Sequence, residues 1–347
     1  MPFARPLHLL LLACCLAVLA ATPLHAQTPL PIKVVIVTTF EIGEDTGDAP
    51  GEFQTWVERE HLTEHLPFPG GVRDLRLNAA HDVLGIVTGM TLSNAGASIM
   101  ALGLDPRFDL THSYWVINGI AGVDPADGTI GTAAWARFVV NDVARQIDAR
   151  EMPPTWPYGL FVIGAHAPDQ MPAHPMTNNL YRLNPTLAQW AFDHTRSLTL
   201  PDNAAMQADR AARWKTVPTA AAPPTVILGD SFASDQYWHG TLMTRYANDW
   251  VTLWTGGAGN FVMSNMEDAA TLEALTRLDH MHRADLGRAM VLRVASNYTE
   301  EAPGQTALSS VTTPYLKSTA LEVAWLTGST VVHELTAHWP TYRDHTP

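Results

Sequence analysis

Short runs of apolar and β-branched residues recur along the chain and are typical of buried strands. These runs occupy residues 32–40, 83–89, 113–122, 158–164, 225–232, 250–257 and 290–297. Segments with helical spacing or composition lie between them, at residues 94–104, 267–287 and 318–339. Because strands alternate with helices, the pattern predicts an α/β fold with a central mixed, partly parallel sheet flanked by helices.

Polar or glycine-rich turns follow several of the predicted strands. In open α/β sheets ligands bind at the carboxyl ends of the strands, where such turns gather. The sequence therefore predicts a binding site built from five strand ends: Glu41, Thr88-Gly89, Asn118-Gly119, Gly229-Asp230-Ser231 and Asn297.

The stretch from about residue 150 to residue 225 is richer in proline than its surroundings. We interpret it as an extended excursion from the same domain, because it returns through "AAAPP" into a predicted strand. No internal repeat or low-complexity tract divides the chain. Residues 27–347 are therefore predicted to form a single domain.

Residues 1–26 have the features of a secretory signal peptide. Arg5 supplies a positive start, an apolar core follows, and "LHA" before Gln27 is a small-residue cleavage site. A retained membrane anchor and a lipoprotein signal ending at Cys14 are the alternatives. We expect cleavage and export of the mature protein across the inner membrane into the periplasm.

Charge and cysteine content narrow the range of partners. The formal net charge is −13, and removal of Arg5, the one charged residue of the leader, leaves −14. An acidic surface argues against nucleic acid or an anionic membrane surface as a partner. Both cysteines, Cys14 and Cys15, lie in the leader, so the mature protein has neither a disulfide nor a cysteine nucleophile.

The longest uncharged stretch of the mature chain, residues 83–104, is long enough to span a bilayer. Several Thr, Ser, Asn and Gly residues interrupt it, however, and a strand, a turn and a helix explain it better. We therefore expect no stable insertion of the mature chain into a membrane.

Two segments are near matches to metal- and cofactor-binding motifs, but each lacks a required spacing or residue. "HELTAH" resembles a zinc-protease signature, but His333 and His338 are five residues apart and would point about 140° from each other on a helix. "TGGAGNF" lacks the third glycine of a dinucleotide-binding loop. We expect no metal and no cofactor, with phosphate left open as a co-substrate.

The strand-end motifs, taken in order, resemble those of the nucleoside phosphorylase and nucleosidase superfamily. More narrowly, the chain resembles the purine nucleoside permease family through "VVIVTTFEIGEDTGDAPGEFQTW", "NGIAGVDP" and "NMEDAATLEAL". The superfamily motifs are "TGMTLSNAGASI" (88–99), "INGIAGVDPADGTIG" (117–131), "LGDSF" (228–232), "NMEDAA" (265–270) and "LRVASNYT" (292–299). This resemblance covers nearly the whole mature chain and implies a nucleoside phosphorylase-like fold, a purine nucleoside ligand and assembly into homo-oligomers.

The resemblance implies that Glu267 accepts hydrogen bonds from the ribose hydroxyls, with Met266 packed beneath the sugar. A carboxylate can accept both hydroxyls at once. The alternative is purely structural, because Ser264 and Glu267 have the spacing of a helix capping box. A structure can decide between them, since a ribose-binding Glu267 should face a cleft shared with Asn118, Phe232 and Asn297.

The resemblance also implies roles for other strand-end residues. Asn297 matches the residue that contacts the purine, and its alternative is a strand-terminating turn. Glu41 matches a water-activating glutamate, although an ordinary solvated carboxylate would suit its acidic loop equally well. Thr88, in the Gly-rich turn, and Phe232, after its strand, are the remaining substrate-binding candidates, while Phe232 could equally be a core aromatic.

The phosphate site departs from the superfamily pattern. Asn118 stands where a phosphate-binding Arg is expected, and "TGMTLSN" contains no Arg or Lys. We therefore expect hydrolysis, or binding without turnover, in preference to phosphorolysis. The leading hypothesis is purine nucleoside binding associated with uptake, with cleavage of the N-glycosidic bond. The alternative is a non-catalytic periplasmic receptor that delivers nucleosides to a membrane transporter.

Overall fold

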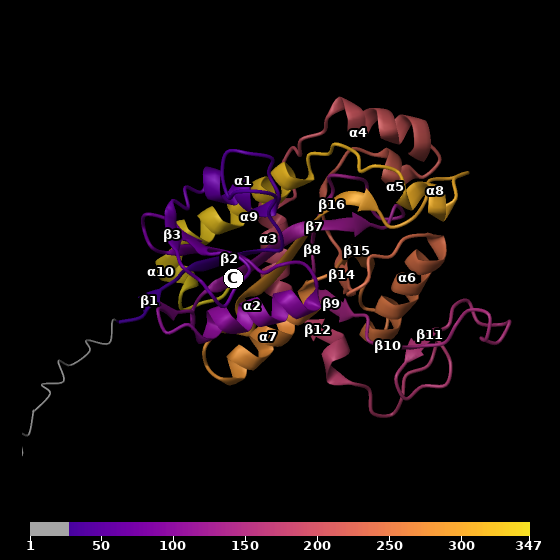
Figure 1. Cartoon of the computed structure of the whole chain (residues 1–347), viewed down its shortest axis with the longest axis horizontal. Helices are drawn as coiled ribbons and strands as arrows, with labels where there is room; N and C mark the ends of the chain where they lie inside the picture. The colour runs from indigo at the N-terminus through magenta and orange to yellow at the C-terminus, as the bar shows by residue number, and fades with distance from the viewer. Residues whose placement is uncertain (1–27) are drawn as a thin grey trace, which may run out of the picture.

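The computed structural model describes residues 28–347, so the predicted signal peptide, residues 1–26, lies outside the described residues. The described chain forms a large mixed sheet with helices on both faces (Figure 1). The alternation of apolar runs and helical segments in the sequence predicted this architecture.

Twelve strands form the main sheet. In spatial order, its path runs through β12 (Leu180–Arg182), β9 (Phe138–Asn141), β14 (Asp230–Ala233), β15 (Phe261–Asn265), β7 (Tyr114–Val123), β2 (Val34–Thr38), β5 (Val83–Val87), β4 (Leu75–Leu77) and β3 (Glu64–Leu66). The long strand β16 (Ala289–Tyr298) pairs with β7 and β8 (Ala133–Trp135), and β8 pairs with β13 (Val226–Leu228). Two small sheets join β1 (Leu30–Pro31) to β6 (Phe108–Asp109) and β10 (Ala144–Gln146) to β11 (Leu160–Val162).

Strand β7 organises the sheet because it pairs with three other strands. It runs parallel to β16 over residues 115–123 and parallel to β2 over residues 114–117. It pairs antiparallel with β15 only at residues 122–123. Strands β2 and β15 therefore approach from opposite directions and both end beside residues 118–121 of β7.

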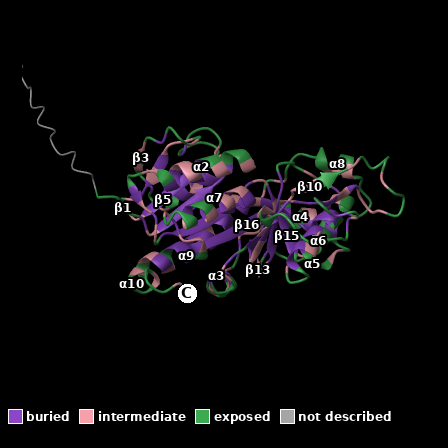
Figure 2. Ribbon diagram, turned by 90° about the horizontal axis from the view of Figure 1, so that it is seen from below, coloured by how far each residue is buried: buried purple, intermediate pink, exposed green. Residues whose placement is uncertain are grey.

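Ten α-helices surround the sheet within the described residues. The longer ones are α1 (Glu52–Arg59), α2 (Leu92–Leu104), α3 (Pro185–Thr195), α6 (Thr241–Thr255), α7 (Asp268–His280) and α9 (Ala320–Ala337). The shorter ones are α4 (Ala204–Asp209), α5 (Pro218–Ala221), α8 (Ala307–Val311) and α10 (Trp339–Tyr342). Helices α2 and α7 cover one face and α1, α3 and α9 the other, and Figure 2 shows the buried strands between these layers.

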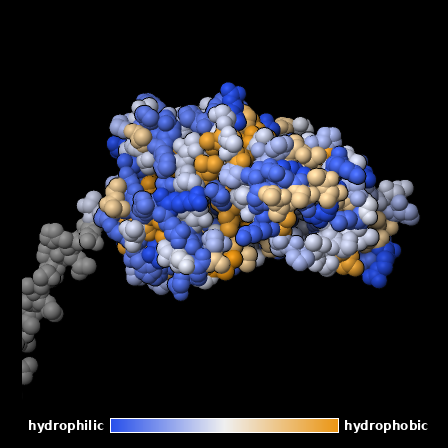
Figure 3. Space-filling view, turned by 90° about the horizontal axis from the view of Figure 1, so that it is seen from above, coloured by the Kyte–Doolittle hydropathy of each residue, from blue (hydrophilic) through white to orange (hydrophobic). Residues whose placement is uncertain are grey.

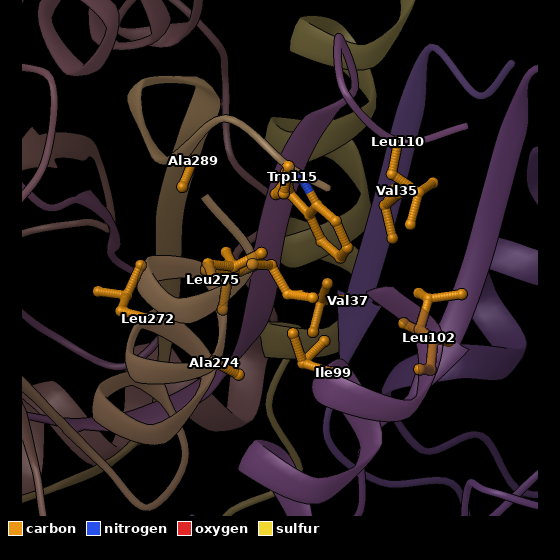
Figure 4. Packing of buried hydrophobic residues seen from close by; sticks show 14 of the residues in the cluster. Val35, Val37, Ile99, Leu102, Leu110, Trp115, Leu272, Ala274, Leu275 and Ala289 are labelled. Atoms are coloured by element: carbon orange, nitrogen blue, oxygen red, sulfur yellow. The ribbon is translucent and has the colours of Figure 1, made fainter. Parts of the chain in front are cut away.

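The apolar run of β2 is continuous because both faces of the strand are buried. Successive side chains of a strand point to opposite faces. Val35 and Val37 therefore pack with Ile99, Leu102 and Leu275 of α2 and α7 (Figure 4). Their neighbours in β2 belong to a second cluster, with Trp56 and α9. Each fully buried side chain of this size contributes about 1.5–3 kcal/mol of hydrophobic stabilisation.

The prediction of a strand at residues 250–257 is wrong, because these residues belong mostly to helix α6. The buried residues recur at helical spacing along its inner face, which the aromatic and β-branched composition concealed: Tyr246, Ala247, Trp250, Val251 and Trp254. Gly256 ends the helix in the left-handed conformation, with a φ of 63°.

The excursion from residue 150 to residue 225 contains more regular structure than the sequence predicted. Strand β12 extends the main sheet by pairing with β9, and α3 packs onto the sheet through Leu187 and Ala191. Asn184 caps α3 by accepting hydrogen bonds from the amides of Thr186 and Leu187. Pro185 then occupies the first helical position, where its missing N–H costs nothing.

The long uncharged stretch at residues 83–104 forms β5, a turn and α2, as expected. No helix within residues 28–347 combines the length and the apolar character needed to cross a bilayer. On the face shown in Figure 3, apolar residues form a band across the middle, between more hydrophilic regions.

Helix α9 approaches the sheet closely at Gly328. A Cβ atom there would lie 2.8 Å from Nδ2 of Asn118 and 2.8 Å from the ring of Trp56. We predict that Gly328→Ala lowers the free energy of unfolding by about 1–3 kcal/mol, because the buried neighbours must move. Urea unfolding followed by circular dichroism measures this change.

The matched control is Gly96→Ala in α2. A Cβ at Gly96 would lie 3.6 Å from the Cβ of Ala270, which is ordinary contact. Replacing a helical glycine with alanine where there is room should stabilise the protein by about 0.5–1 kcal/mol. Equal unfolding midpoints for the two variants would contradict this account of the α9 contact.

Candidate functional site

An open cavity of about 590 Å³ lies where β2 and β15 end beside β7. Four strands contribute to its wall near their carboxyl ends, where ligands bind in open α/β sheets. Of the five strand-end groups named from the sequence, only Asn297 lines this cavity. The contributing strand-end residues are Thr39 after β2, Ile120 and Gly122 of β7, Asn265 of β15 and Asn297 of β16. The convergence of strand ends thus forms a cavity large enough for a small-molecule ligand.

Between the ends of β2 and β15, side chains replace a strand as hydrogen-bond partners of the Ile120 backbone. Its N–H donates to Oε1 of Glu52 at 2.7 Å. Its carbonyl accepts from Nη1 of Arg293 at 3.2 Å. Two charged side chains therefore satisfy main-chain groups at the point where sheet pairing is interrupted.

Glu52, the first residue of α1, is the carboxylate at the inner end of the cavity. Its second oxygen accepts from the amide of Thr39 at 2.6 Å and from the Thr39 hydroxyl at 2.8 Å. Burial raises the pKa of Glu52 to about 7, although the Arg293 guanidinium acts in the opposite direction. The carboxyl group can therefore gain or lose a proton near neutral pH.

Arg293 is buried in β16 and joins two further carboxylates. It donates to Oδ1 of Asp268 through Nε at 3.0 Å and Nη2 at 2.6 Å, and to Oε2 of Glu267 at 3.1 Å. Although burial opposes its charge, Asp268 and Glu267 raise the pKa of Arg293 above its usual value. This guanidinium is the only cation in the cluster, and it faces three carboxylates including Glu52.

Glu267 lies in the cavity wall and does not cap its helix. No side-chain capping bond forms at this position, so the capping box with Ser264 is absent. Asn265 caps α7 instead, since its Oδ1 accepts from the amides of Glu267 and Asp268. Burial raises the pKa of Glu267. Within residues 28–347, its Oε1 accepts a single hydrogen bond, a long one of 3.4 Å from the amide of Thr91. This oxygen can therefore accept further hydrogen bonds from a ligand.

Met266 and Asn297 also line the cavity, and their contacts with the sugar and the base stay predictions. The amide of Asn297 donates to the hydroxyl of Tyr237 at 3.4 Å and to the Tyr298 carbonyl at 3.2 Å. Glu267, Met266 and Asn297 therefore come together in one cavity, which the sequence alone could only propose.

Glu41 does not line the cavity, which corrects its predicted position in the site. Its carboxylate accepts from the backbone amides of Ile42, Gly51 and Gln54 and so ties the acidic loop to the start of α1. Glu52 occupies the cavity in its place. The available signal was its position as an acidic residue opening an amphipathic helix, but the intervening loop hid its link to β2.

Three other predicted substrate contacts also lie outside the cavity wall. The amide of Asn118 donates to the Ala324 carbonyl at 2.9 Å, and its oxygen accepts from the Trp56 indole at 3.4 Å, so it fixes α9 to β7. The Thr88 hydroxyl bonds to main-chain carbonyls of Thr38 and Gly89. Phe232 is fully buried and contacts Trp238, Tyr246 and Phe261 edge-on, as a core aromatic.

The turn before α2 brings a strained residue to the cavity. Thr91 has a φ of 80°, which is rare for a residue other than glycine. This conformation directs its amide toward Glu267 while Met90 lines the cavity. Such strain is concentrated at functional sites, where surrounding structure maintains it.

Comparison with known proteins identifies relatives along nearly the whole chain. The family model described as "Purine nucleoside permease (NUP)" matches residues 31–347. A Schizosaccharomyces pombe protein named "Probable purine nucleoside permease" is 28% identical over 360 residues, which cover 96% of this chain and 99% of that protein. A purine nucleoside permease of Candida albicans is 27% identical over 332 residues, covering 91% of this chain and 79% of its own.

Solved structures share the fold at low sequence identity. A Streptococcus pneumoniae MTA/SAH nucleosidase in complex with 8-aminoadenine aligns with a TM-score of 0.51 and 14% identity, covering 88% of this chain and 100% of that chain. Helicobacter pylori futalosine hydrolase aligns with a TM-score of 0.53 and 13% identity, covering 88% and 98%. The fold is therefore the nucleoside phosphorylase-like one, and the chain belongs to the purine nucleoside permease family.

Proposed function

We propose that this protein binds purine nucleosides in the cavity and hydrolyses their N-glycosidic bond. The observation that carries the proposal is the pair of carboxylates, Glu52 and Glu267, in the wall of a cavity that Met266 and Asn297 also line. The buried guanidinium of Arg293 lies behind this wall and bonds to Glu267. Membership in the purine nucleoside permease family and the nucleosidase-like fold support the same ligand class.

In this proposal Glu267 accepts the ribose hydroxyls and Met266 packs against the sugar. Cleavage builds positive charge on the ribose, as in other glycosyl transfers. The buried carboxylates of Glu267 and Glu52 favour that charge, and burial strengthens the effect because water does not screen them. Arg293 holds Glu267 in place through its hydrogen bond.

Glu52 is the proposed general base. A base is most effective when its pKa lies near the working pH, and burial raises the pKa of Glu52 to about 7. The ionised carboxylate would take a proton from the attacking water. The purine would leave toward Asn297 with the electron pair of the broken carbon–nitrogen bond and would take up a proton from solvent. Bond formation between water oxygen and the ribose carbon accompanies rupture of the carbon–nitrogen bond.

Water suits this cavity better than phosphate does. Lys317 is the one basic residue among those lining the cavity, and it is exposed. The carboxylates of Glu52 and Glu267 would repel an anionic nucleophile. Phosphate as a co-substrate is thus the less favoured possibility on electrostatic grounds.

Binding without turnover is the second candidate function. Asn297 occupies the predicted base side of the cavity, and an amide can bind a purine but cannot protonate it as it leaves. A nucleoside receptor would use the same cavity for binding, and it would not need a group that protonates a departing purine. The measurements below distinguish the two functions.

The proposed location is outside the inner membrane. The features of residues 1–26 support export, and a role in uptake then means capture or cleavage of nucleosides before the free base or nucleoside is transported. The periplasm is accordingly the proposed compartment.

The first test is incubation of the purified protein with inosine, adenosine and guanosine, followed by chromatography of the products. We expect free base and free ribose to form without phosphate. Glu52→Gln should lower kcat by about 100-fold or more, because it removes a general base. Glu58→Gln is the matched control and should change kcat by less than about threefold, since Glu58 lies in the same helix but is exposed and outside the cavity wall.

Two outcomes would contradict the proposal in different ways. Ribose 1-phosphate formed only with phosphate would replace hydrolysis with phosphorolysis. Absence of free base under all conditions, with nucleoside binding retained, would leave the receptor function. In a receptor, Glu267→Gln would weaken binding alone, whereas in an enzyme it should also reduce kcat.

The pH dependence of hydrolysis provides a second test. A general base must be ionised, so protonation of Glu52 should lower kcat/KM as the pH falls below about 7. Below that pH we expect kcat/KM to fall about tenfold for each pH unit, because activity would depend on a single ionised base. A profile that stays flat between pH 5 and pH 8 would contradict the assignment of Glu52.

A further inference from the structure

A second, smaller cavity of about 60 Å³ adjoins the main one. Tyr237, Asn297 and Tyr315 line both cavities, whereas Glu52 and Glu267 line only the larger one. The small cavity therefore lies behind the Asn297 end, away from the proposed ribose position. A base held beside Asn297 would direct its outer edge toward this space.

The small cavity has an aromatic wall that also contains charged and imidazole side chains. Trp214 and Tyr298 form part of the wall and are in contact, with ring centroids 4.0 Å apart and ring planes tilted by 34°. Besides Arg213, whose guanidinium pairs with Asp209, the wall contains His239, from the loop before α6, and Glu300, after β16. Neither has a role in the proposed cleavage.

His239 presents unused hydrogen-bonding capacity. Both ring nitrogens are shielded from solvent, and neither has a hydrogen-bond partner of good geometry within residues 28–347. Burial lowers the pKa of His239, although Glu301 and the Tyr298 carbonyl act in the opposite direction. A neutral imidazole offers one donor and one acceptor, and buried groups of this kind normally have partners.

Glu300 supplies a carboxyl group to the same cavity. Burial and the neighbouring carboxylate of Asp124 raise its pKa to about 7. The ionised form, present at pH 8, accepts hydrogen bonds and donates none. Because Arg213 is already paired with Asp209, the carboxylate of Glu300 and the imidazole of His239 are the groups offered to a ligand. They favour a ligand edge that carries an N–H group beside an oxygen.

We propose that the small cavity receives the outer edge of the base and that Glu300 and His239 select 6-oxopurine nucleosides over 6-aminopurine nucleosides. This inference rests on the proposed nucleoside binding. A 6-oxopurine presents N1–H, which Glu300 accepts, beside O6, which accepts from the His239 ring N–H. A 6-aminopurine reverses the pattern and places the N1 lone pair against the carboxylate.

The size of the small cavity agrees with this assignment. It is about one-tenth of the main cavity, so it can hold the edge of a base but not a nucleoside. The main cavity then holds the sugar and most of the purine. The order along the site is ribose at Glu267, purine at Asn297 and purine edge at Glu300 and His239.

The test is titration calorimetry of the purified protein with inosine and with adenosine at pH 8. We expect inosine to bind more tightly, and Glu300→Gln to reduce the ratio of the two dissociation constants by about tenfold, because an amide can accept from N1–H or donate to N1. Glu301→Gln is the matched control. Glu301 lies outside both cavity walls, accepts from the Thr241 amide, and should leave the ratio unchanged.

His239→Phe is the second variant, which keeps the ring volume and removes both nitrogens. It should also reduce preference for inosine, and thermal melting checks that each variant folds. An unchanged ratio in both folded variants would overturn the selection while leaving nucleoside binding intact. Failure of the parent protein to bind either nucleoside would overturn the proposed function, and this inference with it.

Discussion

The buried guanidinium of Arg293 holds together the part of the molecule on which the site depends. It binds Asp268 and Glu267 directly and partly offsets the effect of burial on Glu52. Removing one member of such a cluster leaves the others uncompensated in a low-dielectric environment. The cost of burying these charges is therefore offset only when β7, β16, α1 and α7 are all in their native positions.

The interruption in sheet pairing creates both the need for this cluster and the space for the cavity. Because β2 and β15 run toward each other along β7, residues between their ends lack a strand partner on that side. Glu52 and Arg293 satisfy the exposed main-chain groups of Ile120. Glu52, which helps to complete the sheet, thus also places a carboxylate in the cavity wall.

Helix termini and turns set the direction of the remaining functional groups. Asn265 caps α7, which leaves the Glu267 carboxylate free to turn toward the cavity. The unusual φ of Thr91 brings its amide to the same carboxylate. Glu41 fixes the loop before α1 and thereby helps to position Glu52, although its own side chain lies elsewhere. Structural and functional roles are therefore divided between neighbouring polar residues.

The sequence by itself determined the fold class, most of the long elements and the convergence of strand ends, because these follow from hydrophobic periodicity and local turn chemistry. It also indicated Met266, Glu267 and Asn297, whose motifs lie directly at strand ends. Periodicity was misleading at α6, where aromatic residues suit either a helix or a strand. Only the tertiary structure placed Glu52 in the cavity wall and Glu41 outside it, and assigned Asn118 and Phe232 to packing. Those assignments depend on which distant groups satisfy each polar or apolar side chain, and separation along the sequence carries no such information.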